Sequence, residues 1–162
     1  MEFTLTEKEK LFLKAAERVI EEWRSVMELD PIWEISVDII EDEHEGAKGA
    51  ISIGESQYYR APILLCESLF EMDEEGFLGE LNDEVIPHEL THLVAADFFR
   101  TALLVAGDNE HLKGELRYKY EQFTVRFAHI ITKLRNENLR LRYELENPDS
   151  EPEANVIDEE SL

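Results

Sequence analysis

Residues 85–107 read VIPHELTHLVAADFFRTALLVAG. Apolar residues cover nearly every side of this stretch at helical spacing, so we expect one buried helix that ends at Gly107. Proline is tolerated in the first turn of a helix, and Pro87 therefore predicts a start near Asp83 or Glu84.

The same stretch contains His88, Glu89 and His92 in the pattern HExxH, which is typical of zinc metallopeptidases. Histidines four residues apart lie about 40° apart around a helix, so both rings can bind one metal ion. Glu89 lies about 100° further round and can act as the general base toward water at the open coordination position. The alternative is a metal-free pair of buried histidines that hydrogen-bond backbone carbonyls.

The third protein ligand distinguishes the classes of HExxH proteins. The extended pattern HExxHxxGxxH is excluded, because Ala95 and Phe98 occupy its glycine and third histidine positions. Asp97 would point about 140° away from His92 in an unbroken helix, so we reject it as a ligand. We therefore expect the third ligand on the helix that follows.

That helix should begin near residues 108–109, and it offers Glu110, Glu115 and Glu121 as candidate ligands. Glu110 lies in the first turn, where the helix dipole also favours a carboxylate. Glu115 has Lys119 four residues later, a spacing typical of an exposed ion pair. Helix stabilisation thus accounts for both of these glutamates without a metal.

Glu121 is our preferred third ligand, with Glu115 next. It shares a face of small residues with Val125, Ala128 and Thr132, and such a face lets another helix approach closely. The expected core stripe lies elsewhere on the helix. It consists of Leu116, Tyr120, Phe123, Phe127, Ile130 and Leu134.

The HExxH motif, Glu121 and the pair Phe127-Ala128 together resemble the minimal gluzincin metallopeptidases of the ImmA/IrrE kind and their small phage-borne relatives. The resemblance covers about residues 30–135. It implies one zinc ion per chain, held by His88, His92 and Glu121, and hydrolysis of a peptide bond in a protein or peptide substrate. Glu89 would be the general base. A donor to the oxyanion is expected as well, and the unassigned candidates are Tyr118, His111, His129 and Arg126.

The other segments predict an α+β, zincin-like fold. Thr6 and Glu9 form a capping box, which predicts an N-terminal helix. Its inward face is expected to contain Leu11, Phe12, Val19, Ile20, Trp23 and Met27.

Three strands should form a small antiparallel or mixed sheet that packs on the HExxH helix and on a long C-terminal helix. Residues 35–39 and 47–53 are expected to pair as a hairpin. Residues 58–66 form an expected edge strand, because Pro62 cannot donate to a sheet ladder, and such an edge could bind extended substrate. Residues 67–80 are expected to form an acidic, solvated loop rather than a lid. We expect one catalytic domain over 1–146 and a disordered acidic tail over 147–162.

Charge and composition limit the partners. The chain has 162 residues and a formal net charge of −22, which disfavours nucleic-acid binding. There is no apolar run long enough for a membrane span and no signal peptide, so we expect a cytoplasmic protein. The single cysteine, Cys66, is expected to be a buried small residue rather than a nucleophile. A zinc-binding regulatory or interaction protein with little turnover is the alternative to an enzyme; no oligomeric state follows from the sequence.

Overall fold

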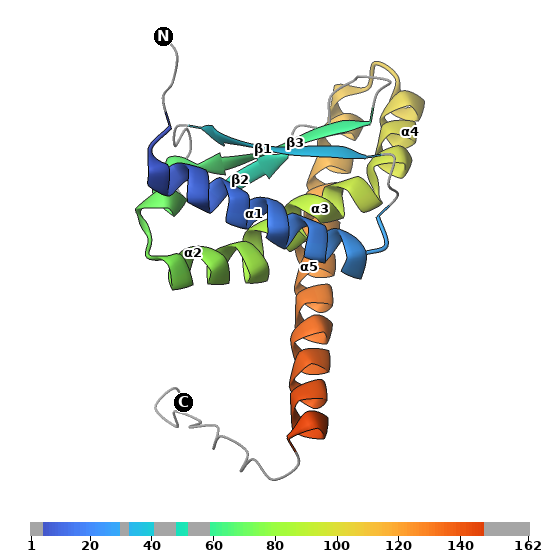
Figure 1. The fold of residues 1–162 in the computed structure, drawn as a ribbon. Coiled ribbons are helices and arrows are strands. Elements are labelled where there is room, and N and C mark those ends of the chain that lie inside the picture. The colour runs from blue at the N-terminus through green and yellow to red at the C-terminus, as the bar shows by residue number, and fades with distance from the viewer. Residues whose placement is uncertain (1–4, 30–32, 41–47, 52–58, 148–162) are drawn as a thin grey trace, which may run out of the picture.

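The computed structural model of the protein describes residues 5–29, 33–40, 48–51 and 59–147. It has the expected α+β class, with a small mixed sheet and a long C-terminal helix (Figure 1). The expected acidic tail lies outside the described residues, except for Asn147. The elements are α1 (Glu7–Val26), β1 (Glu34–Ile40), β2 (Gly49–Ile51), β3 (Arg60–Cys66), η1 (Glu67–Glu71), α2 (Glu74–Glu80), η2 (Leu81–Val85), α3 (Ile86–Val94), α4 (Ala96–Ala106) and α5 (Glu110–Glu146).

The strand order is β1-β3-β2, so the third strand lies in the centre of the sheet. β3 pairs in parallel with β1 and antiparallel with β2. The expected hairpin and the expected edge position of residues 58–66 are therefore both wrong. Pro62 has no backbone N–H to donate to a neighbouring strand. On the side of β2 none is needed, because β2 pairs only with Ile63 to Leu65 of β3 and does not reach the proline. The edge strand beside α3 is β2.

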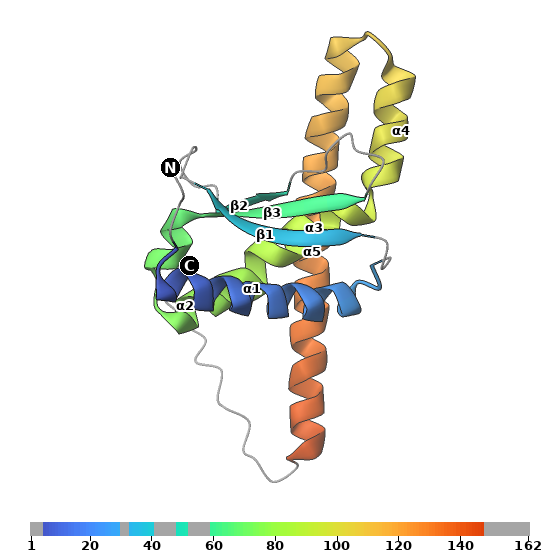
Figure 2. The same ribbon diagram turned by 45° about the horizontal axis from the view of Figure 1, so that its top comes forward.

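The helices α1 and α3 lie on the same side of the sheet, as Figures 1 and 2 both show. Alternate residues of β3, namely Ala61, Ile63 and Leu65, are completely buried. Along α1 the capping box is confirmed, since the Glu9 backbone N–H donates to Thr6 Oγ1 and the Thr6 N–H donates to the Glu9 carboxylate. Its buried face contains Phe12, Val19, Ile20 and Trp23 as expected, but Leu11 is exposed.

Residues 67–80 form helical turns rather than the expected loop. Asp73 caps α2 by accepting from the Gly76 N–H, and the acidic residues of the segment are exposed except for Glu80, which pairs with Lys48. Phe77 is buried and stacks on Phe12, with the ring centroids 4.2 Å apart. The aromatic residues of the segment bring it into the core, because their burial outweighs the solvation of its carboxylates.

The expected single helix over residues 85–107 is interrupted. The predicted start near Asp83 or Glu84 is also wrong, because α3 begins at Ile86. A π-helical turn, η2, joins α2 to α3, and its wider hydrogen bond runs from the Ile86 N–H to the Leu81 carbonyl. Such a turn relaxes the backbone just before Pro87, which cannot donate to an α-helical ladder. A second break at Ala95 separates α3 from α4. As expected, α4 ends before Gly107, whose positive φ of 56° favours glycine.

The long helix α5 packs through its small residues and not through its apolar stripe. Thr124, Ala128 and Thr132 are buried, and α5 contacts α3. In the expected core stripe, Tyr120 stacks on Phe99 of α4 at 4.0 Å, but most of the later residues are exposed. Exposure reaches 42% for Phe123, 54% for Ile130 and 60% for Leu134. The carboxyl-terminal half of α5 extends beyond the sheet and the other helices (Figures 1 and 2). Within the described part of the chain, no helix has the length and apolarity to span a membrane.

A glycine lets β2 approach the helix that carries the motif. A Cβ atom at Gly49 would lie 2.8 Å from Val85 Cγ1 and 3.3 Å from the Leu64 carbonyl oxygen. Val85 is buried and β-branched, so it has little room to move.

We therefore predict that Gly49→Ala lowers the free energy of unfolding by about 1–3 kcal/mol. The matched control is Gly114→Ala in α5, where an added Cβ meets nothing within 4 Å. That change should raise stability by up to about 1 kcal/mol through helix propensity. Urea unfolding of both variants measures the difference, and equal stability of the two would contradict close packing at Gly49.

Candidate metal centre

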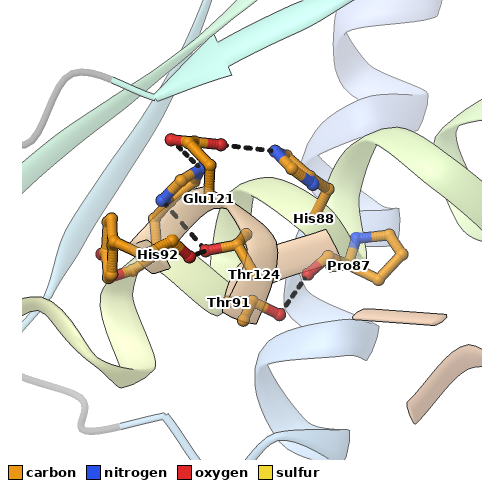
Figure 3. A network of polar contacts seen from close by, with 7 residues as sticks. Pro87, His88, Thr91, His92, Glu121 and Thr124 are labelled. Carbon is orange, nitrogen blue, oxygen red and sulfur yellow. Dashed lines mark hydrogen bonds and ion pairs between the residues drawn. The ribbon is translucent and has the colours of Figure 1, made fainter. Parts of the chain in front are cut away.

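The helix α3 directs His88 and His92 to the same side (Figure 3). The side chain of His92 is 10% exposed and that of His88 is 29% exposed. Within the described residues, neither ring hydrogen-bonds a backbone carbonyl, which is the role that a metal-free pair would need. Thr91, between them, is buried and donates to the Pro87 carbonyl at 2.7 Å, so its hydroxyl is satisfied within the helix.

Glu121 on α5 reaches both histidines. One carboxylate oxygen lies 3.9 Å from His88 Nε2 and the other lies 3.7 Å from His92 Nε2. Ligand atoms around a tetrahedral zinc ion are about 3.3–3.6 Å apart, so a small movement would bring these three groups to coordination distance. The structure thus brings together the three residues expected to be ligands.

The other candidate ligands are turned away from this site. Glu115 faces His111 at 3.7 Å, on the exposed surface of α5. Glu110 pairs with Lys113 at 2.8 Å. Asp97 is exposed on α4.

Thr124 sets the orientation of the His92 ring. Its hydroxyl donates to the Tyr120 carbonyl at 3.0 Å and lies 3.4 Å from His92 Nδ1. With the hydroxyl proton on Tyr120, Thr124 accepts from Nδ1–H, and in that tautomer the Nε2 lone pair faces Glu121. A hydrogen bond of this kind from the nitrogen that does not bind the metal commonly orients histidine ligands. Tyr120 fixes the backbone nearby by donating to the His92 carbonyl at 2.5 Å.

Both imidazoles are neutral at neutral pH. Burial lowers the pKa of His92 to about 4, helped by the neighbouring His88. Burial also lowers the pKa of His88, although the charge of Glu121 opposes the shift. A neutral imidazole keeps one nitrogen unprotonated, so each ring can offer a lone pair to a cation beside the Glu121 carboxylate.

Glu89 lies behind the histidines and is 5% exposed. Burial raises its pKa to about 7, with a further contribution from the charge of Glu121, and a hydrogen bond from the Ile51 backbone N–H opposes the shift. Its carboxylate and the ring nitrogens of His88 and His92 lie within 4.8 Å of one another, a separation compatible with a metal ion. Glu121 is not one of these three residues, but its carboxylate oxygens lie 3.9 and 3.7 Å from the same two rings. A carboxylate with a pKa near neutrality suits a group that accepts and releases a proton.

The cluster lies in an open cleft between β2, α3, α4 and α5, with a volume of about 1140 Å³. A second hollow of about 830 Å³ adjoins it, and the two share Gly49, His88 and Glu89. The cleft and the hollow together form one groove. It passes the cluster on both sides and follows the edge strand β2. Of the four oxyanion candidates, only His129 lines it; Tyr118, His111 and Arg126 do not.

The sequence pattern does not identify Tyr120 and Thr124 as residues of the site. Helical periodicity places Tyr120 in the expected core stripe, and it gives Thr124 no role. Thr124 follows Glu121 by three residues, a spacing that puts the two on adjacent positions of one helix face. This spacing is the available signal for a residue that supports the histidine ligand.

Comparison with known proteins gives no relative: no protein-family model, curated protein or solved structure matches the chain. The function of the cluster is therefore inferred from its own geometry and chemistry.

The buried carboxyl of Glu89 predicts a pH-dependent effect in metal-free protein. Its folded pKa of about 7 lies above the ordinary value of 4.5, so the folded state loses stability as the pH rises from 4.5 through 7. Glu89→Gln cannot ionise and should be more stable than the wild type by up to roughly 3 kcal/mol above about pH 8. As the pH falls from 7 toward 4.5, the ordinary pKa of a glutamate, the stability advantage of Glu89→Gln over the wild type should shrink steadily.

Urea unfolding in the presence of a chelator, between about pH 5.5 and pH 8, measures this difference. Glu115→Gln, on the exposed surface of α5, is the control for the loss of one carboxylate. A constant difference between Glu89→Gln and wild type across the range would show that Glu89 titrates normally.

Proposed function

We propose that the protein is a zinc-dependent metallopeptidase, of the minimal gluzincin type that its motif resembles. The single observation that carries the proposal is the convergence of His88 Nε2, His92 Nε2 and the Glu121 carboxylate beside the buried Glu89. Two imidazoles and one carboxylate form a ligand set that suits zinc and leaves a position open for water or substrate.

The residues around the cluster have separate roles in this proposal. His88, His92 and Glu121 hold the metal, and Thr124 keeps the His92 ring in orientation. When bound, zinc supplies Lewis acidity that acidifies water and polarises the scissile carbonyl. Glu89 takes the proton from the attacking water and passes it to the leaving amine. An extended peptide can lie in the groove and add to the edge of β2, which runs past Glu89.

The first test of this proposal is the metal content. Protein purified without added zinc should contain about one zinc ion per chain, and the double variant His88→Ala/His92→Ala should contain none. Glu121→Ala should weaken zinc affinity at least about tenfold, because it removes a ligand that charge and geometry favour. Zinc content by elemental analysis and competition with a chromogenic chelator measure both effects.

The matched control for the third ligand is Glu115→Ala, on the same helix and with the same loss of charge. It should leave zinc affinity almost unchanged, because Glu115 faces His111 on the surface. A larger loss of affinity in Glu115→Ala than in Glu121→Ala would reject Glu121 as the ligand. Full zinc occupancy in the double histidine variant would reject the site altogether.

A second test separates catalysis from metal binding. Glu89→Gln should keep zinc and fold but lower the rate of peptide hydrolysis by a factor of about 10² to 10⁴, because it removes the general base. Cleavage of unfolded protein substrates and peptide libraries, followed by mass spectrometry, measures the rate. Unchanged cleavage by this variant would point to another mechanism or to a contaminating protease.

A zinc-binding interaction protein with little turnover is the second candidate. The exposed apolar residues Phe123, Ile130 and Leu134 on α5 favour it, because contiguous exposed apolar surface often marks a site of protein contact. A stable complex of the zinc-loaded wild type with an uncut protein partner would support this candidate over the enzyme.

A further inference from the structure

Cationic side chains gather at one end of the cleft. Lys113, Arg117 and Glu121 are spaced four residues apart on α5, so they form a row along one face of the helix. All three line the cleft, and so does Arg100 of α4. The row therefore leads from the candidate metal ligand Glu121 toward the turn between α4 and α5.

This local charge is opposite to that of the chain, whose formal net charge is −22. Among the described residues that line this end of the cleft, Arg100, Lys113 and Arg117 are cationic and Asp108 is acidic. Glu110 does not line the cleft, but it pairs with Lys113 at 2.8 Å and its charge also acts on Arg117. A positive excess inside a cleft of an acidic protein indicates recognition of an anionic group.

The adjoining hollow on the other side of the cluster has a different character. Its described lining combines Lys48 and Lys133 with Asp83, Glu84 and the shared Glu89, so it has no excess of cations. Lys48 is also paired with Glu80, at 2.5 Å. The two ends of the groove thus differ in charge, which gives an extended ligand a preferred direction.

We propose that the end of the cleft near Arg117 and Lys113 binds a carboxylate group of the substrate peptide. The proposal rests on the peptidase function proposed above and adds the class of substrate. Along α5, Arg117 lies about 6 Å and Lys113 about 12 Å from the level of Glu121. The strands run across the direction of α5 (Figures 1 and 2), so a peptide that adds to β2 reaches these cations with a side chain or with its end. The source of the carboxylate is an aspartate or glutamate side chain, or the carboxyl end of the peptide.

The test is the selection of binding peptides by the zinc-loaded Glu89→Gln protein, which measures recognition without hydrolysis. Two displayed libraries of random octapeptides are used, one attached through its carboxyl end and one with that end free. We expect Asp or Glu to be enriched at least about threefold at one position in the first library. Enrichment only in the second library, without acidic side chains, would identify the terminal carboxylate as the source.

The variant Lys113→Gln/Arg117→Glu, made in the same background, should lose the acidic preference. The matched control is Arg140→Gln/Arg142→Glu, which makes the same change of charge on the same helix far from the cleft and should keep the preference. Circular dichroism and zinc content check that both variants are folded. Selection of no peptide, of peptides without a carboxylate preference, or of the same acidic peptides by both variants would overturn the proposal.

Hydrolysis is then measured separately with the wild type and the selected peptides. Binding of carboxylate-bearing peptides that the wild type never cleaves would keep the recognition site and reject the peptidase function. Cleavage of peptides without any such preference would keep the peptidase and reject the basic end of the cleft as a recognition site.

Discussion

The close packing of α3 on α5 is the contact on which the candidate metal centre depends. The two helices meet beside the buried Thr124, Ala128 and Thr132 of α5, whose small side chains let the backbones approach. Glu121 lies on the adjoining part of the same helix face, so the approach brings its carboxylate within 3.7–3.9 Å of the histidine rings. A larger side chain at Ala128 would separate the helices and move Glu121 out of reach.

Two interruptions in the helical backbone shape the cleft around this contact. The π-helical turn before Pro87 joins α2 to α3 without a loop, and α2 in turn buries Phe77 in the core. The break at Ala95 lets α4 leave the direction of α3 and lie beside the amino-terminal part of α5, where Phe99 stacks on Tyr120. If α3 continued without the break at Ala95, the residues of α4 would not line the cleft beside the cluster.

The burial of Glu89 next to a second carboxylate is electrostatically unfavourable. Glu89 is 5% exposed, and the charge of Glu121 disfavours its ionisation further. Their effect appears in the pKa of Glu89, which burial and Glu121 raise to about 7. A chain that already has a net charge of −22 gains little stability from such a pair, so the stability of the fold does not explain the arrangement.

Local residue patterns predicted some of the elements and the spacing of the motif. The capping box at Thr6, the turn at Gly107 and the α+β class follow from local spacing, and the structure agrees with each. The spacing of His88 and His92 places both rings on one helix face, because helical geometry alone decides that relation. The small-residue face of α5 likewise predicted how closely another helix could approach.

Only the tertiary structure decided which elements meet. Pairing energies between strands are similar whichever neighbour is chosen, so periodicity could not show that β3 lies between β1 and β2. The apolar spacing of Phe123, Ile130 and Leu134 could not show that no described element covers them, because periodicity marks a face and not its partner. The support that Thr124 gives to His92 joins residues 32 positions apart, and such a contact exists only once α3 and α5 have packed.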